Sequence, residues 1–167
     1  MNGILLTQIT EMGSIDMDIK APRGVRDILP GESWKWAYVV RTTAEAMADF
    51  GCSEVHLPLF EQTELFSRGV GETTDIVEKE MYTFSDRGGR SVTLRPEATA
   101  GMVRAALENG LCAQGASAKL WCWGPMFRYE RPQKGRYRQF YQIDAEYLGV
   151  AGPMADVETI DLAAEIF

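Results

Sequence analysis

Apolar residues recur at helical spacing in the first long patterned segment of the chain. Between about Ser33 and Gly51 they form one stripe, made of Trp36, Val40, Thr43, Met47 and Phe50. We expect a helix there that ends at Gly51, a residue type that suits a helix C-terminus. The next segment, Glu54–Leu59, has the pattern of a strand, and Pro58 favours an edge or a strand end over a central position.

The middle of the chain predicts a hairpin and a second helix. Met81–Phe84 and Ser91–Leu94 flank a sequence rich in turn formers, which is typical of two hairpin strands. Pro96 and Glu97 then predict the start of a helix that runs to about Leu107, because proline and an early carboxylate both suit a first turn. We expect a last helix from near Asp156, with an apolar side formed by Val157, Ile160, Ala164 and Phe167.

Two later segments, Leu120–Glu130 and Arg136–Leu148, are predicted to be strands joined by a short basic loop. Because side chains alternate along a strand, one face of the first carries Cys122, Gly124, Met126, Arg128 and Glu130. The corresponding face of the second carries Arg136, Phe140, Gln142, Asp144 and Glu146. If the strands pair in antiparallel fashion, these side chains line a single surface.

Composition and charge narrow the class of protein. The 167 residues are 46% hydrophobic and 25% charged, as in an ordinary globular chain, and we expect one domain. No apolar run approaches the ~20 residues that a membrane-spanning helix needs. The net charge of −7 argues against broad affinity for nucleic acid, yet Arg128–Arg138 carries a local +4, which predicts an anionic ligand there.

The few potential metal ligands and thiols exclude other chemistry. His56 is the single histidine, so mechanisms with two imidazoles and most histidine-rich zinc sites are excluded. Cys52, Cys112 and Cys122 show no C-x-x-C spacing, which favours buried thiols in a reducing, cytoplasmic location, with no metal site. Residues 1–20 are weakly patterned, and we expect a flexible N-terminal extension without an assigned function.

A longer motif gives the sharpest indication of function. The sequence FRYERP from Phe127, followed by Arg136-x-x-x-Phe140, resembles motif 2 of the class II aminoacyl-tRNA synthetases. Other matching stretches at Pro22–Pro30, Thr74–Phe84 and Leu94–Glu97 narrow the resemblance to the histidyl-tRNA synthetase family. This implies an α+β fold with a mostly antiparallel sheet flanked by helices. It also implies that residues 21–167 are the N-terminal portion of the catalytic domain, with motifs 1 and 2.

The resemblance implies an enzyme that activates histidine with ATP to histidyl-adenylate and transfers it to tRNA(His). Arg128 is the implied catalytic residue, bridging the amino-acid carboxylate and the α-phosphate, for which a planar two-pronged donor is suited. The implied ATP-binding residues are Arg128, Glu130, Arg136 and Phe140. Phe140 faces adenine, Glu130 accepts from its amino group, and Arg136 holds the outer phosphates. ATP is expected as a substrate together with Mg²⁺, without an organic cofactor.

Histidine binding is implied for a second set, Glu97, Ala98, Thr99, Arg128, Gln142 and Glu146. Glu97, Thr99 and Gln142 are expected to hold the α-ammonium, and Glu146 to accept from the imidazole. Two positions depart from the family pattern, because Ala98 and Asp144 stand where the family favours glycine. Ala98 adds a methyl group to the pocket, and Asp144 adds a negative charge to the predicted active face.

The resemblance also bears on assembly and on alternatives. The first helix and the Pro58 segment correspond to motif 1, which implies a homodimer, and we expect no membrane partner. Motif 3 and the anticodon-binding domain are not in the sequence, so we expect an N-terminal piece. A histidine-sensing regulatory subunit of ATP phosphoribosyltransferase and a dimerisation or RNA-contact fragment stay open. The regulatory relatives tend to lose charged motif 2 residues that this chain keeps, namely Arg128, Glu130, Arg131 and Arg136.

Overall fold

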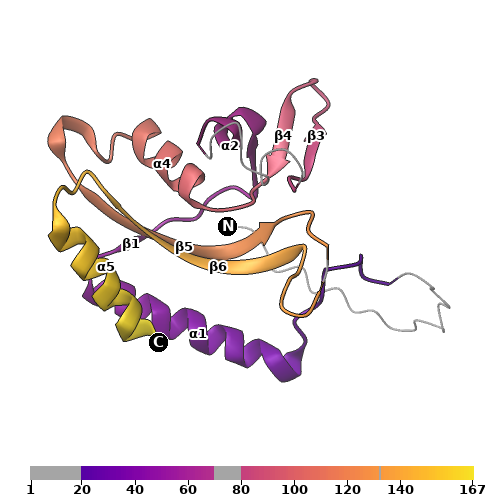
Figure 1. Ribbon diagram of the computed structural model, residues 1–167, viewed down its shortest axis with the longest axis horizontal. Helices are drawn as coiled ribbons and strands as arrows, with labels where there is room; N and C mark the ends of the chain where they lie inside the picture. The colour runs from indigo at the N-terminus through magenta and orange to yellow at the C-terminus, as the bar shows by residue number, and fades with distance from the viewer. Residues whose placement is uncertain (1–19, 70–79, 132) are drawn as a thin grey trace, which may run out of the picture.

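The computed structural model describes residues 20–69, 80–131 and 133–167, so the expected extension lies outside the described residues up to position 19 (Figure 1). The first half contains α1 (Pro30–Asp49), β1 (Ser53–Glu54), β2 (Phe60–Gln62), α2 (Thr63–Gly69), β3 (Thr83–Ser85) and β4 (Ser91–Leu94). The second half contains α4 (Thr99–Glu108), a short 3₁₀ turn (Ala113–Gly115), β5 (Ala118–Phe127), β6 (Gln139–Leu148) and α5 (Pro153–Ile166). The predicted α+β class is confirmed.

The described strands form two sheets. In the larger one the order is β1-β5-β6, with β1 parallel to β5 and β5 antiparallel to β6. The β5–β6 register runs without a break from Ala118 opposite Leu148 to Phe127 opposite Gln139. The smaller sheet, β2-β4-β3, is antiparallel throughout and contains the predicted hairpin. The mostly antiparallel pairing expected from the sequence is therefore present.

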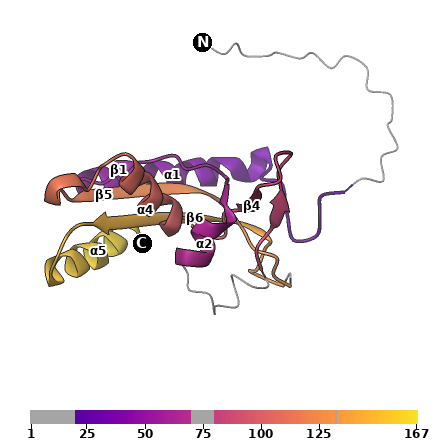
Figure 2. The ribbon, with the colours of Figure 1, turned by 90° about the horizontal axis from the view of Figure 1, so that it is seen from above.

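Helices cover both faces of the larger sheet. α4 lies over one face, and α1 and α5 lie over the other (Figures 1 and 2). Beneath α4, Ala98 and Met102 are buried against Cys122 and Met126 of β5. On the opposite face, the α1 stripe packs as predicted, with Thr43 and Met47 buried and the other predicted members half-buried. The sheet is thus the middle of three layers.

The strand predicted for Glu54–Leu59 is wrong. β1 ends at Glu54, and residues 55–59 lie outside any strand. The backbone carbonyls of Leu57 and Leu59 accept hydrogen bonds from Arg95, from its guanidinium Nη1 at 3.2 Å and its backbone N–H at 3.0 Å. These carbonyls therefore serve a buried arginine instead of a neighbouring strand. The short β2 and the helix α2 that follow were not predicted.

Two predicted element boundaries also need correction. α4 begins at Thr99, with Ala98 at its N-cap, so Pro96 and Glu97 precede the helix. Strand pairing stops at Phe127 and Gln139, which leaves Arg128–Glu130 and Arg136 outside the strands. Although the Arg128 N–H still donates to the Arg138 carbonyl at 2.9 Å, the next backbone N–H groups bond to other segments. Tyr129 donates to Glu80, and Arg138 donates to Gly24.

The apolar side predicted for the last helix is wrong as well. Val157 is 55% exposed and Ile160 is 70% exposed, and Ala164 and Phe167 also face outward. Leu162 is the buried residue of α5, with Ile166 half-buried beside it. Because apolar residues occur on every side of this helix, their spacing alone does not select one face. Within the described parts of the chain, no helix is long and apolar enough to cross a membrane.

Candidate functional site

The candidate site lies on the face of β5 and β6 that α4 partly covers. The register places Gly124 opposite Gln142, Cys122 opposite Asp144, and Leu120 opposite Glu146. Met126 pairs with Phe140. Since paired residues share a face of an antiparallel sheet, the predicted common surface of the two strands is confirmed for these positions. Packing of Ala98 under α4 brings the residues at the helix start to the same surface.

Arg128 connects the two predicted halves of the site. Its Nε donates to the carbonyl oxygen of Pro96 at 2.9 Å, next to Glu97. Its guanidinium carbon lies 5.0 Å from the centre of the Phe140 ring, which is a cation–π arrangement. Arg128 therefore contacts both predicted sets. It lies over Phe140 of the ATP set and bonds to the loop that carries the histidine set.

The predicted histidine-binding residues before and within α4 are held by local hydrogen bonds. The Glu97 carboxylate accepts from the Ala100 N–H at 3.1 and 3.3 Å, which satisfies one of the free donors of the helix start. Thr99 Oγ1 donates to Glu146 Oε1 at 2.6 Å, across from α4 to β6. Ala98 is fully buried in the apolar cluster under α4, so its methyl group belongs to that core.

Two acceptor oxygens on β6 are buried without a hydrogen-bond partner among the described residues. They are Oε1 of Gln142 and Oδ2 of Asp144, which stand two residues apart on the same face. A buried acceptor without a donor is costly, typically by about 1–3 kcal/mol. The surface is therefore suited to a ligand that brings N–H or O–H groups.

Asp144 lies in a strongly acidic environment. Burial raises the pKa of its carboxyl to about 6, and the carboxylates of Glu97 and Glu146 contribute in the same direction. The cations Arg95 and Arg128 oppose this rise in pKa. Opposite Asp144, burial raises the pKa of the Cys122 thiol to about 11, so this cysteine is a protonated thiol at neutral pH. The predicted burial is confirmed for Cys52 and Cys122, whereas Cys112 is only half-buried, and none of the three forms a disulfide.

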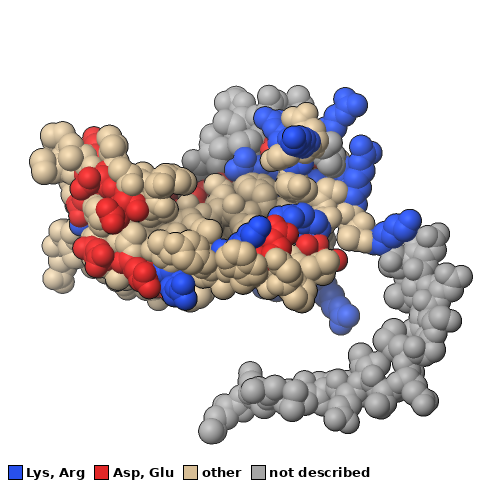
Figure 3. All heavy atoms as spheres, turned by 90° about the horizontal axis from the view of Figure 1, so that it is seen from below, with Lys and Arg blue, Asp and Glu red and all other residues tan. Residues whose placement is uncertain are grey.

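The remaining predicted ATP residues lie where the strands end. Arg136 Nη1 is 3.5 Å from Glu130 Oε2, and the Arg136 side chain is 64% exposed. Arg138 lies 4.1 Å over the Tyr129 ring and donates to the Glu130 carbonyl at 3.2 Å. Figure 3 shows Lys and Arg gathered toward the end of the molecule that carries this loop, and acidic side chains gathered mainly toward the other end. Arg136 is thus at the basic rim, where it pairs with Glu130.

Arg95 is a site residue to which sequence reasoning gave no role. It is 4% exposed, and its Nε donates to the Pro125 carbonyl at 2.9 Å. Its guanidinium crosses β5 at Gly124, where any Cβ would collide with Nη2. Burial lowers the pKa of Arg95, and Asp144 opposes that change. A glycine inside a strand is a signal of such a close approach, and Gly124 could have indicated it.

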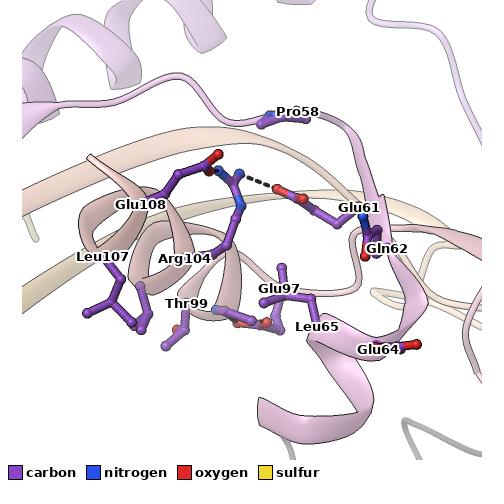
Figure 4. A pocket seen from close by; sticks show the side chains of 12 residues that line it. Pro58, Glu61, Gln62, Glu64, Leu65, Glu97, Thr99, Arg104, Leu107 and Glu108 are labelled. Atoms are coloured by element: carbon purple, nitrogen blue, oxygen red, sulfur yellow. Dashed lines mark hydrogen bonds and ion pairs between the residues drawn. The ribbon is translucent and has the colours of Figure 1, made fainter. Parts of the chain in front are cut away.

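A pocket of about 1120 Å³ lies beside this surface, between α2 and α4 (Figure 4). Glu97 and Thr99 border it, and Arg104 spans it from α4. Arg104 forms ion pairs with Glu61 and with Glu108, the latter at 2.9 Å. Leu65, Val103 and Leu107 supply its apolar wall.

Comparisons with known proteins agree on one family. A sequence model of histidyl-tRNA synthetase matches residues 24–167. A histidine–tRNA ligase of Thermosynechococcus vestitus is 57% identical over 150 residues, which cover 90% of this chain and 35% of that protein. The chain thus spans about a third of the length of such relatives.

Solved structures show the same fold. Apo histidyl-tRNA synthetase of Staphylococcus aureus superposes with a TM-score of 0.74 at 40% identity, over 89% of this chain and 34% of that one. A Bacillus halodurans protein described as an ATP phosphoribosyltransferase regulatory subunit/histidyl-tRNA synthetase gives 0.75 at 23% identity, over 90% and 38% of the two chains. At that identity, the second likeness shows the fold alone. Together with the sequence matches, the first shows that the chain belongs to the histidyl-tRNA synthetase family.

Proposed function

We propose that this chain supplies the first part of a histidine–tRNA ligase active site, which activates histidine with ATP and then charges tRNA(His). The observation that carries the proposal is the placement of Arg128 between Pro96, beside Glu97, and the Phe140 ring. An arginine at this point can contact a carboxylate and a phosphate that meet there.

The amino-acid end of the site is rich in acceptors. Glu97 and Gln142 take the α-ammonium with the Thr99 hydroxyl, and Glu146 takes an imidazole N–H. In the free chain Thr99 and Glu146 bond to each other at 2.6 Å, so histidine replaces this contact when it binds. A pocket built to satisfy specific N–H groups discriminates strongly against amino acids that lack them.

The nucleotide end lies along Phe140 and the basic loop. Adenine stacks on Phe140, its amino group donates to Glu130, and the outer phosphates lie near Arg136. The buried Oε2 of Glu130 makes an ion pair with Arg136 but no hydrogen bond among the described residues, which supports a role as an acceptor for a ligand.

In the reaction, a carboxylate oxygen of histidine attacks the α-phosphorus of ATP, and the bond to pyrophosphate breaks. Arg128 neutralises the carboxylate and the α-phosphate as they approach, and it stabilises the charge that develops on the phosphate oxygens. The described residues contain no cluster of three or more His, Cys, Asp or Glu side chains that could hold a metal ion. Mg²⁺ bound with ATP would supply further positive charge at the phosphates.

The assembly and location are part of the same proposal. Exposed apolar residues on α1, among them Trp34 at 63% and Tyr38 at 56%, support a homodimer through the motif 1 region. The basic loop supports contact with the tRNA acceptor end. Cytoplasmic location follows from the proposed role and from the three unpaired cysteines.

The test is histidine-dependent exchange of pyrophosphate into ATP. The chain is assayed alone and joined to the remaining two thirds of the Thermosynechococcus vestitus ligase, with histidine compared against the other amino acids. In the joined protein we expect exchange with histidine and with no other amino acid. The Arg128→Ala variant should lower the exchange rate by about 10²–10³-fold. Histidine binding without any exchange in the joined protein would instead identify a histidine sensor.

A further inference from the structure

Asp144 occupies the middle of the acceptor surface. It stands between Gln142 and Glu146 on the same face of β6, opposite Cys122 of β5. Its Oδ2 is buried and lacks a hydrogen-bond partner among the described residues, as does Oε1 of Gln142. A carboxylate oxygen and an amide oxygen are both acceptors, so neither can satisfy the other. Both are therefore available to accept a hydrogen bond from a ligand.

The charges around Asp144 are unbalanced in the free chain. The groups that interact with it are Glu146 on β6, Cys122 on β5, Glu97 and Arg95 between β4 and α4, and Arg128 after β5. Because the Cys122 thiol is neutral, the charged groups are the three carboxylates, including that of Asp144, and the guanidinium groups of Arg95 and Arg128. Arg95 is fixed by the Pro125 and Leu57 carbonyls, so it does not move to pair with Asp144. One further cation balances the site.

Resting on the proposed function, we infer that Asp144 is a further histidine-binding residue whose carboxylate accepts a hydrogen bond from the α-ammonium of the amino acid. An ammonium has three N–H donors. Asp144 Oδ2, Gln142 Oε1 and the Glu97 carboxylate are acceptors on adjoining parts of one surface. With the Thr99 hydroxyl they make four acceptors, so one of the three N–H donors is shared between two of them. Asp144 adjoins Gln142, which is proposed for the ammonium, on the same face of β6.

The experiment measures histidine affinity by titration calorimetry with the joined protein of the exchange test and its Asp144→Asn variant. Loss of a charged acceptor to an ammonium typically weakens binding about 10- to 100-fold, and we expect a loss in this range at pH 7.5. Asp161→Asn removes a carboxylate from the outer side of α5, and it serves as the control that should bind as the unchanged joined protein does.

Two analogues locate the contact. Histamine keeps the ammonium and lacks the carboxylate, whereas 3-(imidazol-4-yl)propanoate keeps the carboxylate and lacks the ammonium. The loss of affinity caused by Asp144→Asn should persist with histamine and should fall below about twofold with the propanoate. An equal loss with both analogues would overturn the proposed contact, since the ammonium would then play no part.

A pH series gives a second, independent readout. Only the ionised carboxylate attracts the ammonium, so the affinity ratio between the unchanged joined protein and Asp144→Asn should shrink toward one as the pH falls from 7.5 to 5. Titration of the ligand's own imidazole is common to both proteins and cancels in this ratio. A ratio that stays constant over the series overturns the inference.

The outcomes separate the two proposals. If the joined protein with the unchanged Asp144 does not bind histidine, the proposed function and this inference both fail. If it binds histidine and Asp144→Asn binds equally well, only the role of Asp144 fails. Near-ultraviolet circular dichroism checks the fold of each variant, and Asp144→Ser is the replacement should the asparagine variant not fold.

Discussion

The hydrogen bond between Thr99 and Glu146 gives a test at the scale of single residues. It joins a hydroxyl proposed for the ammonium to a carboxylate proposed for the imidazole, at 2.6 Å. Thr99→Val keeps the shape and removes the hydroxyl, so we expect about tenfold weaker histidine binding, measured by calorimetry. Thr99→Ser keeps the hydroxyl and should bind within about threefold of the unchanged chain. Equal binding by the valine variant would contradict the assigned role of Thr99.

The close approach of Arg95 to Gly124 gives a second prediction. A methyl group at position 124 collides with the Arg95 guanidinium, which is fixed by two backbone carbonyls. Gly124→Ala should lower the free energy of unfolding by about 1–3 kcal/mol, measured by urea denaturation. The matched control is Gly31→Ala in the first turn of α1, where nothing lies within 4 Å of the added Cβ. If the two variants are equally stable, Arg95 is not held as described.

Some features of these residues were predictable from the sequence, and others were not. The shared face of Gln142 and Glu146 was predictable, because alternation along a strand is a local property. Gly124 could have indicated a close approach, but it could not identify Arg95 as the approaching group, since the carbonyl partners of Arg95 at Leu57 and Pro125 are far from it in the sequence. Asp144 was recognised as an added charge, but its buried, unpartnered oxygen depends on packing between layers.

At the scale of elements, the β3–β4 hairpin was predictable because its turn is held by its own residues. Asp86 Oδ1 accepts from the N–H groups of Gly88 at 2.8 Å and Arg90 at 2.9 Å. Its Oδ2 accepts from Arg90 Nε at 2.7 Å. The segment 55–59 is the opposite case, because its conformation depends on Arg95, so the strand pattern around Pro58 misled the prediction.

Asp86 therefore provides an element-scale prediction. Hydrogen bonds from the Arg90 backbone N–H and then from its side chain lower the pKa of the Asp86 carboxyl. A lowered pKa means that its stabilisation is present above about pH 4 and is lost as the pH falls through the folded-state value. Asp86→Ala should accelerate hydrogen exchange at the Gly88 and Arg90 amides, whereas Asp86→Asn should retain part of the protection. Unchanged exchange in the alanine variant would show that the backbone alone holds the turn.

At the scale of the whole molecule, the last helix shows the limit of pattern reading most clearly. α5 packs on α1 through Leu162, yet Met154 and Ile160 remain 72% and 70% exposed. Apolar residues on all sides of a helix mean that its orientation is decided by the layers it joins and not by its own periodicity. The fold class and the central register were predictable, whereas the seating of this outer helix was not.

Asp144 links the site to the stability of the whole chain. Its folded-state pKa of about 6 lies above the usual value near 3.9, so burying the ionised form opposes folding. The favourable contribution of the neutral acid is complete below about pH 4 and is lost as the pH rises through 6. Asp144→Asn should therefore be more stable than the unchanged chain at pH 7.5, by about 1–2 kcal/mol after allowance for partial exposure. The difference should disappear near pH 4.

Histidine should offset this difference in stability at pH 7.5. A ligand stabilises the folded state in proportion to the logarithm of its concentration over Kd, so a tenfold difference in affinity is equivalent to about 1.4 kcal/mol at saturation. Urea unfolding of both proteins, with and without saturating histidine, measures the two effects together. Without histidine, the Asp144→Asn variant should have the larger free energy of unfolding. With saturating histidine, this difference should disappear. If Asp144→Asn is the less stable protein without ligand, the carboxylate stabilises the fold, and its unpartnered oxygen is not held for a substrate.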